Sequence, residues 1–316
     1  MSVCAMSKRL RVIFMGSPAF AVPSLRRMLA DGHAVALAVT QPDRPAGRGY
    51  ALRPPPVKTL AAERGLPVLQ PERLKESAVL EALAAARPEV IVVVAFGQFL
   101  PREVRELPPL GCVNVHASLL PKYRGAAPIN WALIRGETET GVSIMRVEAA
   151  MDAGPVLLQR RMPIAPEENA GSLHDRLAEE GALALAAGLE LLAAGQANWS
   201  PQDDSRATQA PKITDAECRL SLPAEAAAVV NRVRGLAPAP GAYLPLRHQR
   251  LKILQAAARA DGAPPGTILE IADHALAIGT GAGAVALLEV QPEGRRRMTG
   301  AEFARGQRLT PGELLV

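Results

Sequence analysis

The sequence predicts two domains: an α/β domain built on a doubly wound, mostly parallel sheet, and a smaller all-β domain that follows it. In the first half of the chain, short apolar runs alternate with helical patterns. A polar, proline-containing stretch without periodicity then interrupts the chain at residues 198–211. Beyond it, short runs rich in Val, Ile and Leu are separated by Gly and Pro. We therefore expect a first domain at residues 1–197, a linker at 198–211 and a second domain at 212–316.

The expected elements of the first domain follow from these runs. Strands are predicted at residues 10–15, 34–40, 90–95 and 112–116, with a short extended piece near Val68. Helices are predicted from the Gly16 turn to about Ala30, over 77–86 and over 128–134. Strand, helix and strand at this spacing indicate a parallel sheet with both faces covered.

The end of the first domain has a different pattern. Residues 140–147 and 156–162 are predicted to form an antiparallel pair that extends the sheet edge. A long alanine-rich helix over 172–194 closes the domain, with Ser172 as its expected N-cap.

The second domain is predicted to begin with a helix over 224–233. The short apolar runs that follow it lie at 242–246, 251–258, 266–271, 275–279 and 284–290. Several short strands at close spacing favour a small closed β-barrel of the oligonucleotide-binding (OB) kind.

The composition, with 48% hydrophobic and 21% charged residues, is that of an ordinary soluble globular protein. No strongly apolar run approaches the roughly 20 residues of a membrane-spanning helix. The first residues hold no apolar segment ahead of a cleavage site, so we expect no signal peptide and a cytoplasmic location. The three cysteines form no C-x-x-C pair and the five histidines do not cluster, which argues against a disulfide framework and a metal site. Cys112 is expected to be a small buried apolar residue.

Basic residues gather in the segment 41–58, which is punctuated by Gly and Pro. Arg44, Arg48, Arg53 and Lys58 occur there with no acid between them. A loop of this length and charge could bind phosphate groups, although its composition alone favours a solvated surface loop. Residues 207–316 carry 13 basic and 10 acidic side chains, a mild excess that is compatible with a polyanionic partner.

The segment VNVHASLLPKYRG, which begins at Val113, carries the strongest chemical pattern. Side chains two apart on a strand share a face, so Asn114 and His116 project together. A carboxamide that donates a hydrogen bond, beside an imidazole that can transfer a proton, could catalyse attack on a carbonyl carbon. Either residue alone is more often structural. Asp152, in the sequence MDAG, is a candidate third member, although alone it reads as a turn residue.

The first strand-to-helix turn, FMGSPAFAVPSL, contains a single glycine, Gly16. A dinucleotide fingerprint needs two further glycines for the approach of the pyrophosphate. The turn therefore argues against a nicotinamide dinucleotide cofactor.

Together, Asn114, His116, SLLPKYRG and Asp152 resemble the catalytic signature of the 10-formyltetrahydrofolate-dependent formyltransferases. The resemblance implies transfer of a formyl group from 10-formyltetrahydrofolate to the free amine of initiator methionyl-tRNA. Asn114 would donate a hydrogen bond to the oxyanion and His116 would relay protons, while Asp152 would hold the imidazole and orient a water.

The resemblance also implies binding residues. Folate contacts are expected from Ser118, Leu119, Leu120 and Pro121, and from Phe96, Gly97, Gln98 and Leu100. The segment 41–58, with Arg44, Arg48, Arg53 and Lys58, would contact the acceptor end of the tRNA. A monomer that needs neither a metal nor a membrane is expected.

The resemblance covers nearly the whole chain and includes PKIT (211–214) and GQRLTPGELL (306–315) in the second domain. Two departures concern aromatic residues. Ala239 stands where the family usually has tryptophan, and an aromatic that is common near residues 220–222 is missing.

Other functions remain open at this point. The acceptor could be a sugar-nucleotide or another small-molecule amine, although such an enzyme is expected to lack the basic segment. A hydrolase that directs water at the same formyl donor would use the same three residues. A non-catalytic RNA-binding protein would need none of Asn114, His116 and Asp152.

Overall fold

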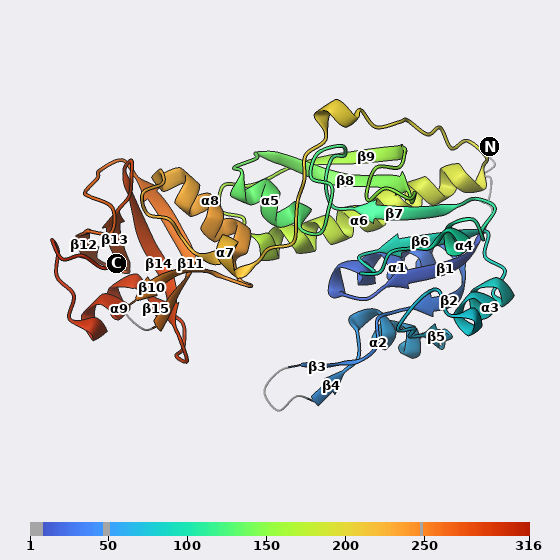
Figure 1. The fold of residues 1–316 in the computed structure, drawn as a ribbon, viewed down its shortest axis with the longest axis horizontal. Coiled ribbons are helices and arrows are strands. Elements are labelled where there is room, and N and C mark those ends of the chain that lie inside the picture. The colour runs from blue at the N-terminus through green and yellow to red at the C-terminus, as the bar shows by residue number, and fades with distance from the viewer. Residues whose placement is uncertain (1–8, 47–50, 247–248) are drawn as a thin grey trace, which may run out of the picture. The chain divides into compact units, whose positions relative to one another are not determined.

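A computed structural model describes residues 9–46, 51–246 and 249–316 (Figure 1). The chain forms two compact units, each assembled from separated segments. Unit 1 contains the chain up to Gly125, Thr140–Met162 and His174–Gln209. Unit 2 contains Ala126–Glu139, Pro163–Leu173 and Ala210–Val316. The domain limits inferred from the sequence stay a prediction.

Unit 1 is built on a seven-stranded sheet in the order β5-β2-β1-β6-β7-β8-β9. The strands are β1 Arg11–Gly16, β2 Ala34–Val39, β5 Val68–Leu69, β6 Val90–Val94, β7 Cys112–His116, β8 Glu139–Arg146 and β9 Val156–Pro163. The first five strands in this order are parallel, and β8 runs antiparallel to β7. All five residues of β6 are buried, as expected for a strand covered on both faces. The predicted mostly parallel α/β sheet is confirmed.

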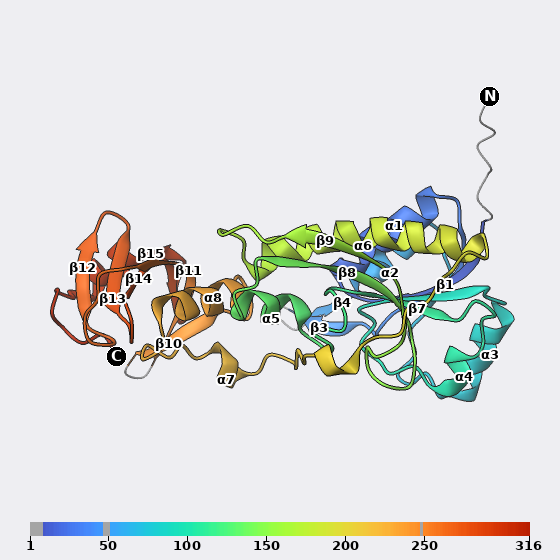
Figure 2. The ribbon, with the colours of Figure 1, turned by 90° about the horizontal axis from the view of Figure 1, so that it is seen from above.

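Helices cover both faces of this sheet. They are α1 Val22–Ala30, preceded by the 3-10 turn η1 Ala19–Ala21, α2 Pro56–Glu63, α3 Ser77–Ala85, α4 Arg102–Arg105 and α6 Ala170–Ala193. Figure 2 shows α1 and α6 over one face, and α3 and α4 over the other. Beneath α3 and α4, Val79, Leu83 and Val104 pack on Ile13 and Ile91 of the central strands. Burial of these side chains drives the two layers together.

The helix α6 begins two residues earlier than the sequence suggested. The side chain of Asn169 accepts hydrogen bonds from the N–H groups of Gly171 and Ser172, at 2.9 and 3.1 Å. The Ser172 hydroxyl in turn accepts from the N–H of Asn169 at 3.1 Å. Asn169 is therefore the N-cap, and the prediction of Ser172 in that role is wrong: Ser172 is the third helical residue of a reciprocal cap.

The basic segment 41–58 is also more ordered than a long loop. Strands β3 Arg44–Ala46 and β4 Ala51–Arg53 pair as an antiparallel hairpin, and α2 begins at Pro56. Pro56 occupies the first helical position, where a missing N–H costs nothing. Three consecutive prolines thus end the hairpin and start the helix.

Unit 2 contains an antiparallel sheet in the order β10-β11-β14-β13-β12, with β15 paired to β14. Its strands are β10 Ala242–Leu246, β11 Gln249–Arg259, β12 Ile268–Ala272, β13 Ala275–Gly279, β14 Ala284–Pro292 and β15 Met298–Thr299. Its helices are α5 Pro128–Ile134, α7 Asp215–Cys218, α8 Ala226–Leu236 and α9 Gly300–Gln307. The antiparallel C-terminal β domain predicted from the sequence is confirmed.

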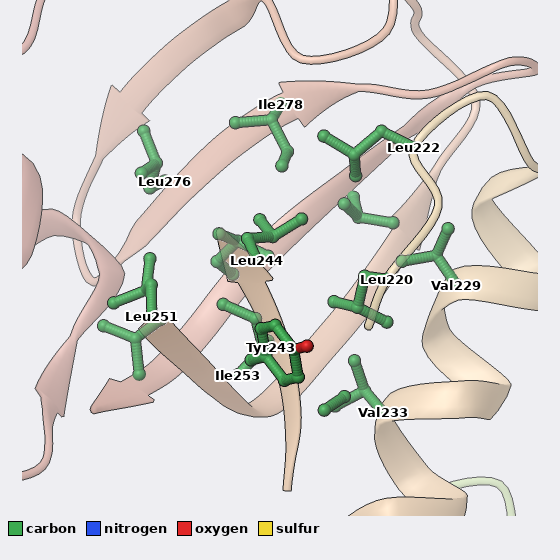
Figure 3. Close-up of a cluster of buried hydrophobic side chains, with 14 of the residues drawn as sticks. Leu220, Leu222, Val229, Val233, Tyr243, Leu244, Leu251, Ile253, Leu276 and Ile278 are labelled. Carbon is green, nitrogen blue, oxygen red and sulfur yellow. The ribbon is translucent and has the colours of Figure 1, made fainter. Parts of the chain in front are cut away.

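The core of unit 2 lies between α8 and the sheet (Figure 3). Val229 and Val233 of α8 face Leu244 and Ile253 of the strands. Leu220 and Leu222, close to the position of the missing aromatic, lie in this core and are each 5% exposed. Aliphatic side chains therefore fill the space, whereas Ala239 is exposed and leaves no gap in the core. No helix in the described part of the chain is both long and apolar enough to cross a membrane.

Helices α5 and α8 approach each other closely at Gly235. A Cβ on Gly235 would lie 2.5 Å from Cγ1 of Ile134 and 2.9 Å from the carbonyl oxygen of Asn130. The side-chain amide of Asn130 also donates a hydrogen bond to the Gly235 carbonyl at 2.7 Å. Only glycine fits at this crossing without displacing α5.

Gly235→Ala should lower the free energy of unfolding by about 1–3 kcal/mol, because the added methyl overpacks the α5–α8 contact. Urea unfolding of the whole protein measures the change. Gly306→Ala in α9 is the matched control, since a Cβ there meets nothing within 4 Å. The control should be neutral or slightly stabilising, and equal losses in the two variants would contradict the explanation.

Candidate active site

Asn114 and His116 lie on β7, the last parallel strand of the sheet. Val113 and Val115 alternate with them and are buried in the core at 0% and 4% exposure. The two polar side chains therefore share a face at the carboxyl end of the strand, the place where ligands bind in open α/β sheets.

The imidazole of His116 is held in one orientation. Its Nε2 lies 2.9 Å from the carbonyl oxygen of Tyr123. A carbonyl can only accept, so Nε2 carries the proton and donates it. On the other side of the ring, Nδ1 lies 3.7 Å from Oδ2 of Asp152. That distance exceeds a hydrogen bond, and both groups are shielded from solvent, so the contact is electrostatic.

Asp152 lies in the loop between β8 and β9. Its backbone is left-handed, with φ of 51°, a conformation that Asp tolerates better than most residues. Its Oδ2 accepts a hydrogen bond from the N–H of Gly125 at 2.9 Å. A Cβ at Gly154 would overlap the carbonyl oxygen of Arg146, so the MDAG motif needs its glycine for close backbone approach.

A cavity of about 270 Å³ opens beside these residues. It is lined by Val93, Gly97, Gln98, Phe99, Leu100, Asn114, Met145, Val147, Glu148, Ala150, Met151 and Asp152. The carboxamide of Asn114 makes no hydrogen bond with any described residue, so its donors are free for a ligand. Phe99 and Met151 also line the cavity, where they are 61% and 67% exposed, and neither belongs to a motif that predicts this position.

Sequence models of known families match both parts of the chain. The Formyl transferase model matches residues 8–189, and the model of the Formyl transferase C-terminal domain matches residues 212–308. The chain belongs to the formyl transferase family. The family predicted from the residues of β7 and the MDAG loop is confirmed.

Full-length relatives are methionyl-tRNA formyltransferases. The protein of Syntrophus aciditrophicus is 48% identical, over 97% of this chain and 99% of its own. That of Geobacter sulfurreducens is 46% identical, over 97% of this chain and 96% of its own. The function predicted from the resemblance agrees with these relatives.

Solved structures share the formyl transferase fold at low identity. HypX from Aquifex aeolicus in complex with tetrahydrofolic acid matches 94% of this chain and 47% of its own, with 18% identity and a TM-score of 0.66. An N-formyltransferase from Helicobacter canadensis matches 88% of this chain and 99% of its own, with 14% identity and a TM-score of 0.67. At these identities the likeness concerns the fold alone.

The predicted folate contacts separate into two groups in this formyl transferase. Gly97, Gln98 and Leu100 line the cavity. Phe96 is 2% exposed and packs in the core beneath α3 and α4 instead. Gly97 has φ of 83°, which lets the chain turn back toward the cavity after the buried Phe96.

The turn Ser118–Leu119–Leu120–Pro121 lies outside the described lining of the cavity. Its four carbonyl oxygens and the Leu120 N–H already have partners within the chain. The buried hydroxyl of Ser143 donates to the Ser118 carbonyl at 2.7 Å and accepts from the Leu120 N–H at 3.1 Å. The amide of Gln159 donates to the Leu120 carbonyl and to Ser143 Oγ, each at 2.8 Å. These hydrogen bonds hold the turn in a fixed position beside the imidazole.

The basic residues of the hairpin differ in their surroundings. Arg44 and Arg53 are exposed and directly opposite each other on β3 and β4. No carboxylate in the described chain pairs with either of them, and like charges at this spacing repel. Arg48 lies outside the described residues.

Lys58 lies on α2, and its Nζ is 2.7 and 2.8 Å from the two carboxylate oxygens of Asp43. Hydrogen bonds from Lys58 and Gln70 hold the pKa of Asp43 below its ordinary value. The charge of Lys58 is therefore already compensated by Asp43, the acid directly before Arg44.

Cys112 is 1% exposed at the start of β7. Burial raises the pKa of its thiol to about 12, so the thiolate is not populated near neutral pH. The prediction of a buried apolar role is confirmed. Within the described residues, no three His, Cys, Asp or Glu side chains gather as a metal site.

Ser143→Ala should lower the free energy of unfolding by about 1–3 kcal/mol, because it leaves the buried Leu120 N–H without an acceptor. Urea unfolding measures the loss. Ser77→Ala is the control, since Ser77 is exposed on α3 and should change stability little. A Ser143 variant as stable as the control would show that the turn is held by packing alone.

Proposed function

We propose that this formyl transferase moves the formyl group of 10-formyltetrahydrofolate to the free amine of initiator methionyl-tRNA. The full-length relatives, at 46–48% identity, support the reaction and the methionyl-tRNA acceptor. The tetrahydrofolic acid in the HypX complex supports the donor class. One observation carries the mechanism: the unpaired Asn114 carboxamide and the Asp152 loop face one cavity, with the His116 imidazole beside Asp152.

The reaction is acyl transfer between two amines. The amine of the methionyl ester attacks the formyl carbon, and the carbonyl oxygen becomes an oxyanion. The Asn114 carboxamide donates a hydrogen bond to that oxygen, in a site partly shielded from water. No covalent bond to the protein is required.

Proton transfer then falls to His116. Its Nε2–H is occupied by the Tyr123 carbonyl, so Nδ1 is the nitrogen that takes up and releases the proton. The Asp152 carboxylate, 3.7 Å away, stabilises the charged imidazolium during the step. N10 of the folate leaves with a proton, and the N-formylated methionyl-tRNA is released.

Asn114→Ala should reduce kcat by about 100-fold or more, because one oxyanion donor is worth roughly 3–4 kcal/mol. Formyl transfer from 10-formyltetrahydrofolate is measured on methionyl initiator and methionyl elongator tRNA, with His116→Ala as the blank. Rapid transfer to the initiator alone is expected. Transfer to a sugar-nucleotide amine, with neither tRNA accepted, would contradict the proposed acceptor.

Arg44 and Arg53 are proposed to contact phosphates of the tRNA. An anion between them relieves the repulsion of two opposed guanidinium groups on the hairpin. Lys58 is proposed to support the hairpin without contacting the tRNA, because its pair with Asp43 joins the start of the hairpin to α2. A direct contact by Arg48 stays a prediction from sequence.

The double variant Arg44→Gln, Arg53→Gln should weaken tRNA binding and reduce the slope of log K against log salt by about 1.5, as expected for two lost phosphate contacts. Binding is measured across a salt series. Arg27→Gln, Arg102→Gln is the control with the same change of charge, because each of those arginines is paired with an acid four residues further along the chain. An equal drop of slope in both variants would mean that only net charge matters.

A further inference from the structure

The segment Trp199–Gln209, here called the strap, contacts two parts of unit 1 beside the active site. They are the turn after β7 and the residues from Asp152 to the start of β9. Ser200 pairs with Val156 through two backbone hydrogen bonds of 2.8 and 2.9 Å. Farther along, the Thr208 hydroxyl accepts from the Tyr123 N–H at 2.8 Å, and the Thr208 carbonyl accepts from the Arg124 N–H at 2.9 Å. The strap therefore binds Tyr123 itself, the residue whose carbonyl orients His116.

Gln202 lies at the middle of the strap and uses every hydrogen-bonding position of its side chain. Its Nε2 donates to the carbonyl oxygens of Asp152 and Gly154 at 2.8 and 2.7 Å. Its Oε1 accepts from Nε and Nη2 of Arg124 at 3.0 and 2.8 Å. The Arg124 side chain is 10% exposed, so this network is largely buried. Buried groups with all their partners present specify one arrangement strongly.

These bonds close a ring around Asp152. The Arg124 guanidinium holds Gln202, which holds the backbone of Asp152 in its left-handed conformation. Gly125, the neighbour of Arg124, donates its N–H to the Asp152 carboxylate. Both the backbone and the carboxylate of Asp152 are thus tied to residues 124–125, and the same carboxylate oxygen faces His116.

We propose that Gln202 is a positioning residue of the formyl-transfer reaction: it keeps the Asp152 carboxylate against His116 by holding the loop backbone. The inference rests on the proposed roles of Asp152 and His116. Gln202 lines no part of the described cavity and acts only through Asp152. A carboxylate displaced by about 1 Å stabilises the imidazolium less well, and a misplacement of that size can slow a reaction by on the order of 100-fold.

The test is Gln202→Glu, which keeps the size and the acceptor for Arg124 but replaces the two donors by a carboxylate oxygen. Both loop carbonyls then lose their partner and face a negative charge. Relative to wild type, kcat should fall by about 100-fold. The KM for the folate donor should stay within about threefold, and the midpoint of the pH–rate profile should move. Ser200→Ala on the same strap is the control, since its side chain is exposed.

A second readout does not depend on activity. The Gly125 amide donates to the Asp152 carboxylate, so its hydrogen exchange should accelerate in Gln202→Glu and not in Ser200→Ala. Absence of transfer by the wild type would count against the proposed function alone, and Gly125 exchange would still decide the role of Gln202.

Two outcomes would overturn the proposal. The first is a folded Gln202→Glu protein with wild-type kcat and unchanged Gly125 exchange. The second is a loss of activity that follows the loss of folded protein, with an unchanged pH profile. If Gln202→Glu does not fold, Gln202→Met is measured in the same way. It removes the two donated hydrogen bonds without adding a charge, and it also removes the acceptor for Arg124.

Discussion

The hydrogen bond between His116 and the Tyr123 carbonyl connects the chemistry of this protein to its fold. The ring lies at the end of a strand whose other side chains are buried, so the sheet determines where the imidazole is. The carbonyl comes from a turn that is held by Ser143, Gln159 and Thr208. The hydrogen bond assigns the proton to Nε2, and Nδ1 faces Asp152. A change at Ser143, Gln159 or Thr208 would therefore alter the orientation of the imidazole through its hydrogen bond to the Tyr123 carbonyl.

Much of the fold follows from local pattern. The bounds of β7, α5, β10 and β13 agree with the sequence-based ranges, because each is a short apolar run ended by polar or turn residues. The N-cap of α6 was misassigned since Asn169 and Ser172 are both good capping residues, and only the backbone shows which one precedes the helix. Short helices such as α4 and α7 carry too few apolar positions to be seen in a periodicity.

The candidate site was predictable only in part, and for a physical reason. Asn114 and His116 share a strand, so their spacing alone places them together. Gln202 and Ser143 have no such signal, because their partners are far away along the chain and are mostly backbone atoms, which any sequence supplies. The count of charges in the sequence does not separate Lys58 from Arg44 either. The stretch from Arg44 to Lys58 holds no acid, but Asp43 directly before it pairs with Lys58.

The strap also affects which part of the chain is needed for catalysis. The family model for the first domain ends at residue 189, and that for the second begins at 212, so Trp199–Gln209 belongs to neither. Its hydrogen bonds nevertheless hold residues that surround the reacting groups. A fragment trimmed at the end of the first family model would keep every strand of the seven-stranded sheet. It would lack Gln202 and Thr208. On the proposed role of Gln202, the residues needed for catalysis extend to Gln209, beyond residue 189, where the first family model ends.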